Sequence, residues 1–304
     1  MNAERVRVEI VAPVHNRKKI TLQCLRSLSR LNANGLDVHV VIVDDGSTDG
    51  TGTAIASEFP EVEIIQGDGN LWYTEGTNVG IRAALKHDPQ FILMINDDEV
   101  FDSDFLRYMV GTALKYDRTI VGSLLLLWDK PHTLFQVAPV WDTWLGDWRH
   151  WNQQTVWTVP ERPWEVDLIV GNCVLVPVEA FAEGGLMDSA KYPNFGDAVF
   201  TPKLKKLGWN LLIDPRAKVF CQPNAIPPRI RSLGAKKALT ALISDLGNTH
   251  NLRRRLYAYL EGSPSRIHGI AGFLMFLFRA VFKTKSRSVE PPLRETFASA
   301  VVDD

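Results

Sequence analysis

The sequence predicts an α/β fold with a Rossmann-like sheet, and three observations indicate it. Phe91–Ile95 is a run of five apolar residues that stops at three polar ones, Asn96–Asp98. A central strand of an α/β sheet has this form, because both of its faces are buried while its carboxyl end reaches the sheet edge. Two further β-rich runs, 6–12 and 38–43, also end in polar loops. Segments of helical spacing separate these runs, and such alternation is typical of βαβ units.

The helices and a third strand follow from periodicity and turn residues. After the first polar loop, apolar residues recur at mostly helical spacing until Asn34-Gly35, which predicts a helix that ends there. The turn at 44–50 is dense in side-chain acceptors and leads into a second helix near Thr51. Residues 61–66 are expected to form a strand, and the loop within 67–80 passes into a third helix.

The polar loops after the strands are expected to converge. Right-handed crossovers place the carboxyl ends of parallel strands at one sheet edge, where open α/β sheets bind their ligands. The loops at 15–17, 44–49 and 96–98 should therefore meet. Paired carboxylates there suit a hard divalent cation, which prefers oxygen ligands and often bridges to substrate phosphates. An acidic turn or a helix N-cap is the alternative, since Asp and Asn favour both.

Two common kinds of nucleotide site are missing from the sequence. The first strand is followed by PVHNR, which has no glycine, and this argues against a Rossmann dinucleotide site. No GxxxxGK[ST] motif occurs either. A nucleotide could still bind through Arg17 and through Asp44 or Asp45, with its diphosphate on a metal held at Asp97 and Asp98.

Composition is ordinary for a folded protein, but the charge is unevenly distributed. The 304 residues are 45% hydrophobic and 23% charged, with a net charge of −1. Residues 229–287 nevertheless hold twelve Lys and Arg against two acids, which suggests that this tail meets an anionic surface. No nucleic-acid-binding motif is present. The scattered Cys24, Cys173 and Cys221 are expected to be reduced thiols of a cytoplasmic protein, and residues 1–10 show no apolar signal region.

The tail is expected to be helical and to contact a membrane. Residues 230–260 have helical character, and Pro264 interrupts them. The segment 267–282 is nearly all apolar, but its 16 residues are short for a membrane span, which needs about 20. Cations flank it, so it suits lying in the interface of an anionic membrane. The alternative is a helix packed on the rest of the protein or on a partner subunit.

Several segments, in this order and spacing, resemble family 2 glycosyltransferases with the GT-A fold. They are PVHNR, VDDGSTDGT (43–51), GNLWYTEGTNVGI (69–81), INDDE (95–99), GNCVLV (171–176), GGLMD (184–188) and FGDAVFTPKLKKLGW (195–209). The resemblance covers roughly residues 6–221, and its LWY variant is similar to bacterial enzymes that build surface polysaccharides such as O-antigen, including rhamnosyltransferase-like members. It implies a mixed sheet with helices on both faces. It also implies a catalytic domain at 1–228, with a nucleotide-sugar half to about 100 and an acceptor half after it, and the helical tail at 229–304.

The resemblance implies a donor site at the converging loops. Asn96-Asp97-Asp98 stands where the family has Asp-x-Asp, so Asp98 is the leading ligand for Mg²⁺ or Mn²⁺ and Asp97 faces the donor sugar or ribose. Asn96 replaces the first Asp of the motif. Of the two acids at 44–45, one is expected to bind base or ribose and the other to shape the turn. The implied nucleotide and donor contacts are Pro13, His15, Asn16, Arg17, Asp44, Asp45, Trp72, Asn78, Asn96 and Asp97.

The resemblance also implies a catalytic base. Asp197 stands where the family has the Asp of a Glu-Asp pair, with Gly196 in place of the Glu. Inverting transfer needs such a base to deprotonate the acceptor hydroxyl, and a cation to stabilise the departing diphosphate. On the residues alone, Asp197 could instead cap the helix that starts near Ala198. Lys203 stands where many members have Arg, and is a candidate acceptor contact.

Six of the nine tryptophans lie between Trp141 and Trp164. Aromatic faces stack on sugar rings, so Trp141, Trp144 and Trp148 are candidates for an acceptor wall. A locally packed hairpin or a dimer contact is the alternative. Trp72, beside the implied donor loop, has the stronger claim.

The sequence therefore predicts a cytoplasmic, metal-dependent, inverting glycosyltransferase at the inner face of the cell membrane. The expected donor is a nucleoside-diphosphate sugar, with UDP or dTDP favoured, and the expected acceptor is a glycan or a lipid-linked glycan. A homo-oligomer is compatible with the sequence. The alternatives are a non-catalytic glycan-binding or scaffold relative and a sugar-nucleotide pyrophosphorylase, although PVHNR lacks the glycine- and arginine-rich loop of the latter.

Overall fold

Strands and helices alternate through the first part of the chain and then give way to a mixed arrangement. The computed structural model describes residues 5–136, 140–149, 154–222, 233–248 and 250–282. The first elements are β1 (Val6–Val14), α1 (Lys18–Leu28), β2 (Leu36–Asp44), α2 (Thr51–Glu58), β3 (Glu63–Gln66), α3 (Trp72–Ala84), the 3₁₀ turn η1 (Leu85–His87) and β4 (Phe91–Ile95). The remainder are β5 (Glu99–Phe101), α4 (Phe105–Lys115), β6 (Thr119–Leu127), β7 (Leu134–Gln136), β8 (Val140–Asp142), β9 (Asp147–Arg149), β10 (Trp164–Glu165), β11 (Cys173–Pro177), α5 (Val178–Gly184), α6 (Asp197–Lys206), β12 (Asn210–Cys221), α7 (Ala235–Ile243), α8 (Leu252–Gly262) and α9 (Arg266–Phe282).

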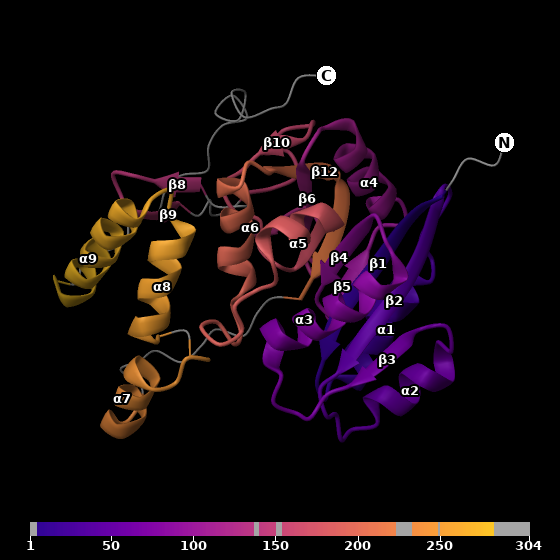
Figure 1. The fold of residues 1–304 in the computed structure, drawn as a ribbon, viewed down its shortest axis with the longest axis horizontal. Coiled ribbons are helices and arrows are strands. Elements are labelled where there is room, and N and C mark those ends of the chain that lie inside the picture. Colours follow the sequence, from indigo (N-terminus) through magenta and orange to yellow (C-terminus); the bar gives the residue numbers. More distant parts are fainter. Residues whose placement is uncertain (1–4, 137–139, 150–153, 223–232, 249, 283–304) are drawn as a thin grey trace.

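A mixed sheet forms the centre of the fold, in the order β10-β12-β6-β11-β4-β1-β2-β3 (Figure 1). β1 is parallel to β2 and to β4, and β2 is parallel to β3, as the strand–helix alternation predicts. β11 enters antiparallel between β4 and β6, which makes the sheet mixed. The fold class predicted from the sequence is confirmed.

Helices cover both faces of the sheet, and each face has its own apolar core. Alternate residues of a strand point to opposite faces. Phe91, Leu93 and Ile95 of β4 accordingly pack with α1, α2 and α4, while Ile92 and Met94 pack with α3, α5 and α6. The apolar run in β4 is thus buried on both sides, because it is a central strand.

The carboxyl ends of β1, β2 and β4 lie at one edge of the sheet. β1 and β2 end together, with Val14 opposite Asp44, and β4 runs in the same direction beside β1. The loops that follow are joined by hydrogen bonds: the backbone amide of Asn16 donates to Ser47 Oγ at 2.9 Å, and that of Lys18 donates to Asp49 Oδ2 at 3.0 Å. The predicted convergence is confirmed.

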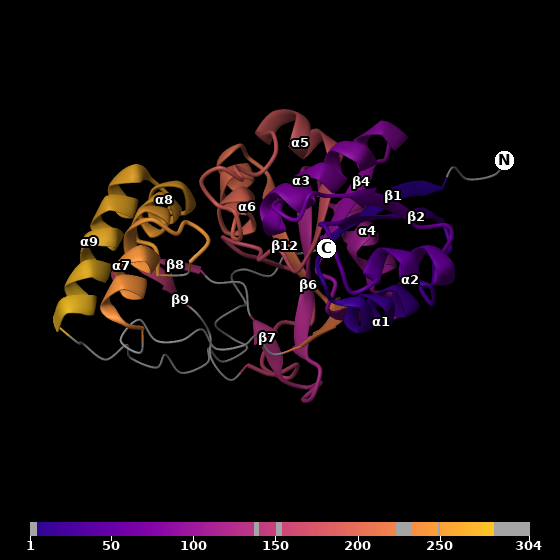
Figure 2. The same cartoon turned by 90° about the horizontal axis from the view of Figure 1, so that it is seen from below.

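The described residues of the tail form the helices α7, α8 and α9, which lie beside α6 on the side of the molecule away from β1 and β2 (Figure 2). α8 and α9 pack on each other, and α8 also packs on α6. The hairpin β8–β9 is held against this pair, because Arg279 of α9 donates to the carbonyl of Leu145 at 2.6 Å and contacts Asp147 at 3.2 Å. The boundary predicted at 228–229 falls within residues 223–232, which lie outside the described residues, as do 283–304.

In the described part of the chain, no helix is both long enough and apolar enough to cross a membrane. The three cysteines are free and buried.

Candidate functional site

A cavity of about 460 Å³ opens at the edge where the three loops meet. Its volume lies within the usual range for small-molecule sites, about 300–1,000 Å³. Its walls come from the ends of β1 and β4, from the turn after β2, from the start of α3 and from the loop before α6. They consist of Pro13, Val14, His15, Arg17, Asp45, Gly69, Trp72, Tyr73, Asn96, Asp97, Asp98 and Asn194.

Arg17 binds both acids that follow β4. Its Nη1 donates to Asp97 Oδ1 at 2.6 Å, and its Nη2 donates to Asp98 Oδ2 at 2.9 Å. Thr21 Oγ1 of α1 donates to the other oxygen of Asp97 at 3.1 Å. Burial raises the pKa of Asp97 to about 6, although Arg17 acts in the opposite direction. In this structure one guanidinium therefore bridges the two carboxylates.

The two acids after β2 have different roles. Asp44 is buried, and its Oδ1 accepts from the amide of Ser47 at 3.1 Å, which shapes the turn. Asp45 lines the cavity, and its carboxylate accepts from the amides of Gly69, Leu71 and Trp72 at 2.8, 3.0 and 3.2 Å. Asp45 therefore fixes the loop before α3, and Asp44 does not reach the cavity.

The first loop is fixed by its own side chains. The Nδ1 of His15 lies 2.5 Å from the carbonyl oxygen of Asp45, to which it donates, and its Nε2 accepts from Asn16 Nδ2 at 2.9 Å. The amide oxygen of Asn16 accepts from the backbone N–H of Thr48 at 2.7 Å. Both ring nitrogens of His15 are thus engaged, which agrees with a positioning role and leaves neither for proton transfer.

Trp72 is held in an unusual backbone conformation at the first residue of α3. Its φ is +57°, in the left-handed region that bulky residues rarely adopt. The bond from its amide to Asp45 helps to hold it there, and 57% of its side-chain surface is exposed at the cavity. Strain of this kind is found most often at functional sites, and Trp72 lines the cavity.

Asp197 does not line the cavity, but it contacts the same glycine, Gly171, as Tyr73, which does line it. Its Oδ2 accepts from the amide of Gly171 at 2.9 Å, while Tyr73 Oη donates to the carbonyl of the same glycine at 3.0 Å. Desolvation raises the pKa of Asp197 above its ordinary range, although the amides of Gly171, Asp197 and Ala198 act in the opposite direction. The carboxylate thus faces both β11 and the start of its own helix, and α6 begins at Asp197 itself.

Gly171 is required as a glycine between these two side chains. A Cβ on Gly171 would collide with the Cβ of Asp197 and would lie 2.7 Å from Tyr73 Oη. We expect Gly171→Ala to lower the free energy of unfolding by about 1–3 kcal/mol, the usual effect of overpacking. Urea denaturation measures it. The control is Gly111→Ala in α4, where a Cβ meets nothing and which should be neutral or stabilising. Equal effects of the two substitutions would contradict this account.

Several predicted residues lie away from the cavity. Asn78 is buried, and its side-chain amide forms two hydrogen bonds with the backbone of Met187. Its Nδ2 donates to the carbonyl oxygen at 2.8 Å, and its Oδ1 accepts from the N–H at 3.2 Å. This contact joins α3 to the loop after α5 and leaves no support for a donor contact. Lys203 lies on α6, in a different cavity described below.

The tryptophans belong to the hairpin and its packing. Trp141 is buried, with its ring edge-on to Trp148 at 5.4 Å and to Tyr259 of α8 at 6.2 Å. Trp141 and Trp148 also line a small cavity of about 230 Å³, and Trp144 is 93% exposed at the hairpin turn. The structure therefore contains the packed hairpin that was the alternative. An acceptor-binding role for these tryptophans stays a prediction.

Four residues at or near the cavity were not predicted as site residues from the sequence: Gly69, Tyr73, Gly171 and Asn194. Tyr73 and Gly69 fall inside the GNLWYTEG segment, so proximity to Trp72 was the available indication. Gly171 opens the GNCVLV segment, which carried the resemblance but no residue role, and Asn194 lies in the loop before α6 without any distinguishing pattern.

The acids of the cavity could hold a divalent cation only if the phosphates of a bound donor supply further oxygen ligands. Asp45, Asp97 and Asp98 outnumber Arg17 on its walls, so the cavity carries an excess of negative charge. Among the described residues, no group of three His, Cys, Asp or Glu side chains is placed to hold a metal. Mg²⁺ often takes one or two carboxylates and completes its shell with water and substrate phosphates. Asp98 and Asp97 match that pattern, provided that Arg17 releases them.

Comparison with known proteins shows which family the first part of the chain is similar to, and which solved structures share its fold. Residues 9–154 match the model described as "Glycosyl transferase family 2". The chain is 24% identical over 205 residues to an N-acetylglucosaminyl-diphospho-decaprenol L-rhamnosyltransferase of Mycobacterium tuberculosis, covering 60% of this chain and 66% of the relative. It is also 24% identical over 119 residues to the glycosyltransferase GlyA of Streptococcus pneumoniae, covering 38% of this chain and 16% of the relative.

Solved structures with the GT-A fold superpose on almost the whole chain. GalNAc-T7 with UDP, GalNAc and Mn²⁺ gives a TM-score of 0.60 at 13% identity, covering 95% of this chain and 59% of GalNAc-T7. S. aureus TarS (residues 1–349) with UDP-GlcNAc gives 0.56 at 14% identity, covering 93% of this chain and 74% of that one. The chain spans less than two thirds of GalNAc-T7 and of the mycobacterial relative.

Proposed function

Because the chain carries a family 2 glycosyltransferase domain on a GT-A fold, we propose that it transfers a sugar, with inversion, from a nucleoside diphosphate to a glycan or lipid-linked glycan. The proposed setting is bacterial cell-surface polysaccharide synthesis. The mycobacterial relative is named for an acceptor sugar carried on decaprenol diphosphate, which favours the lipid-linked class. The donor is proposed to be a UDP- or dTDP-sugar.

The observation that carries the proposal is the cavity at which three loops bring together three acids, one cation and an exposed indole. Trp72 offers a flat apolar face, which suits a base or a sugar ring. Asp45 supplies carboxylate oxygens beside it, which suits a ribose hydroxyl. Asp97 and Asp98 follow the end of β4 and line the same cavity, which suits the diphosphate end of the same ligand.

The proposed chemistry is a displacement at the anomeric carbon. The acceptor hydroxyl gives its proton to Asp197 as its oxygen bonds to that carbon, and the bond from the carbon to the diphosphate oxygen breaks. The proton ends on Asp197, and the electron pair ends on the nucleoside diphosphate. A bound Mg²⁺ or Mn²⁺ supplies Lewis-acid stabilisation of that diphosphate. We propose that Arg17 moves from the carboxylates to the phosphates of the donor, because a guanidinium can donate two N–H groups to either kind of anion.

Equilibrium binding tests this site without turnover. UDP, dTDP, GDP and CMP are titrated by calorimetry into the full chain, with Mn²⁺ and then with EDTA. We expect one nucleotide to bind tightly only with metal, and a Trp72→Ala variant to lose affinity, by about 1–3 kcal/mol if the base stacks on the indole. No binding of any nucleotide would leave the cavity without its proposed ligand.

We further propose that the tail places the protein at a membrane surface. The exposed side of α9 carries an apolar stripe at helical spacing, in which Ile267, Ile270 and Leu274 are 79%, 52% and 59% exposed. A helix with such a face lies in the interface of an anionic bilayer. The proposed division is a catalytic part at 1–228 and a membrane-contacting tail at 229–304.

Replacing Ile270 and Leu274 together with Glu is expected to weaken binding to anionic vesicles at least about tenfold, because burial of each apolar side chain contributes on the order of 1.5–3 kcal/mol. Vesicle co-sedimentation measures it. The control is Leu114→Glu on α4, a residue 62% exposed outside the tail. Unchanged sedimentation of the α9 variant would argue against the membrane proposal.

A further inference from the structure

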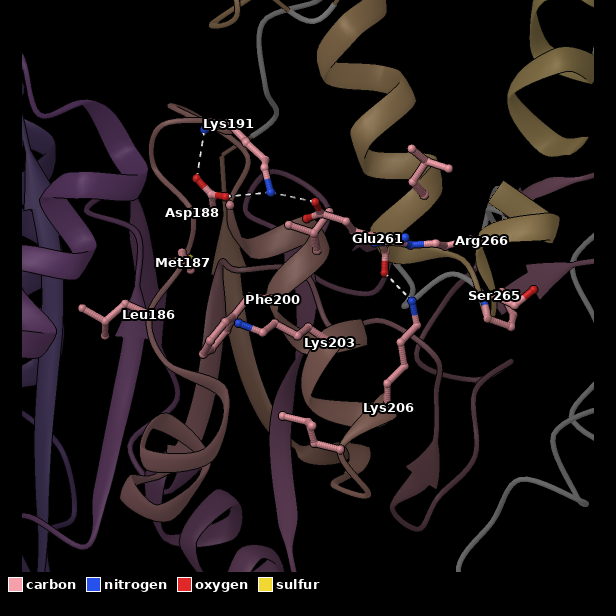
Figure 3. A pocket seen from close by; sticks show the side chains of 15 residues that line it. Leu186, Met187, Asp188, Lys191, Phe200, Lys203, Lys206, Glu261, Ser265 and Arg266 are labelled. Carbon is pink, nitrogen blue, oxygen red and sulfur yellow. Dashed lines mark hydrogen bonds and ion pairs between the residues drawn. The ribbon is translucent and has the colours of Figure 1, made fainter. Parts of the chain in front are cut away.

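A second cavity, of about 550 Å³, lies between α6, the loop after α5 and the junction of α8 with α9 (Figure 3). It shares no lining residue with the cavity at the sheet edge. Its existence depends on the tail, since Glu261, Ser265 and Arg266 form one of its sides. None of the residues assigned to the proposed transfer reaction lines this cavity.

The cavity holds more positive charge than its acids neutralise. Lys191 is paired, with its Nζ 3.0 Å from Asp188 and 3.1 Å from Glu261. Lys206 donates to the backbone carbonyl of Glu261 at 2.5 Å, and Lys203 donates to that of Gly184. Within the described residues, neither lysine has an ion pair with a carboxylate.

Arg266 adds a third cation. It is exposed at the first residue of α9, and no described carboxylate pairs with it. Figure 3 shows Arg266 and Lys206 close to Glu261, and it shows Lys203 next to Phe200. Three cations around one hollow are what a phosphate-rich group requires, because lysine and arginine are the usual protein partners of phosphate.

The rest of the wall is apolar. Leu186, Val199, Phe200, Leu207 and Leu260 line the same hollow, so a ligand that fills it must combine anionic and hydrocarbon parts. Inorganic phosphate or a nucleotide would leave this surface uncovered.

The position of the cavity relates it to Asp197 and to the membrane-facing helix. Gly196, which directly precedes Asp197, lines it. Lys203 and Lys206 follow Asp197 by six and nine residues, which is about 9 and 14 Å along the axis of α6. At the other end, Arg266 is followed by Ile267, the first residue of the exposed stripe on α9.

We propose that this cavity binds the diphosphate and the adjoining isoprenoid of a lipid-linked acceptor. The inference rests on the proposed transfer reaction and deepens it. The cations hold the diphosphate, so the sugar attached to it extends along α6 toward Asp197. The hydrocarbon chain covers the apolar wall and leaves past α9 toward the bilayer.

Farnesyl diphosphate is the probe, titrated by calorimetry into the full chain in EDTA. Pyrophosphate in EDTA and UDP with Mn²⁺ are separate arms. We expect farnesyl diphosphate to bind at least tenfold tighter than pyrophosphate. The double variant Lys206→Met/Arg266→Met should bind it at least tenfold more weakly. The matched control is Lys236→Met/Lys237→Met on α7, which removes two exposed cations outside the cavity and should bind as the wild type does.

A second variant tests the apolar wall and does not remove charge. Leu207 is 44% exposed at the cavity, and Leu207→Trp should weaken farnesyl diphosphate while leaving pyrophosphate unchanged. Equal binding of farnesyl diphosphate to wild type and to both variants would overturn the proposal, as would equal affinity for farnesyl diphosphate and pyrophosphate. If the donor site itself were misassigned, UDP binding with metal would fail while these lipid results stood, so the two failures are distinguishable.

Discussion

An Asp197→Asn variant is expected to transfer sugar about 10²–10⁴-fold more slowly than the wild type, the range that loss of a general base produces. Asn has nearly the same shape, and its carbonyl oxygen can still accept from the amide of Gly171, which Asp197 now binds at 2.9 Å. It cannot take a proton from the acceptor. Nucleotide binding should therefore be unchanged while kcat collapses.

The matched control is Glu179→Gln, which removes an exposed carboxylate from the first turn of the neighbouring helix α5. Its kcat should equal that of the wild type. If Asp197→Asn retained full activity, the carboxylate would be a helix-start residue only, as its contacts with the amides of α6 also allow.

The same assignment predicts a pH dependence. Asp197 acts as a base only when it is deprotonated, and desolvation raises its pKa. Activity should therefore be lost, as pH falls, at a value above about 4, the ordinary pKa of aspartate. The kcat–pH profile measures this acid limb, and a limb at or below that value would contradict the assignment.

An Arg17→Gln variant is expected to bind Mn²⁺ at least about tenfold tighter than the wild type in the absence of donor. Arg17 now forms an ion pair with both Asp97 and Asp98, and removing it leaves two adjacent carboxylates that a divalent cation can bridge. Without metal, the variant should lose about 1–3 kcal/mol of unfolding free energy, less than for a fully buried pair because the Arg17 side chain is 38% exposed.

Thermal unfolding with and without Mn²⁺, together with a direct Mn²⁺ titration, measures both effects. Arg26→Gln is the control, because it breaks a bidentate pair with Glu58 at 2.6 and 2.8 Å on the surface, away from the cavity. It should change stability little, because exposed ion pairs contribute little, and it should leave the Mn²⁺ response unaltered. A wild type that binds Mn²⁺ as tightly as Arg17→Gln does would show that Arg17 does not compete with metal.

Much of the fold followed from local patterns. The apolar run at Phe91–Ile95 and the polar loops after β1 and β2 were sufficient to place three parallel strands and one functional edge. These features are encoded locally, by periodicity and by turn residues. The helical tail was recognised for the same reason.

What the sequence could not give are contacts between side chains far apart in the chain. The bond from Arg17 to Asp97 and Asp98 spans 80 residues, and its geometry depends on how two loops are oriented. The hydrogen bond from Asn78 to Met187 spans 109 residues. The second cavity exists because α8 packs on α6, and no pattern in either segment indicates that pairing.

The central claim is that the cavity at the sheet edge turns over a nucleotide sugar. The most direct test is a release assay with UDP-, dTDP-, GDP- and CMP-sugars, run with Mg²⁺ or Mn²⁺ and with EDTA. The account predicts metal-dependent release of one nucleotide, abolished in a variant in which Asp97 and Asp98 are both replaced by Asn. If no nucleotide were released from any donor, with or without acceptor, the cavity would not be a transferase site. A non-catalytic glycan-binding protein would then be the better interpretation.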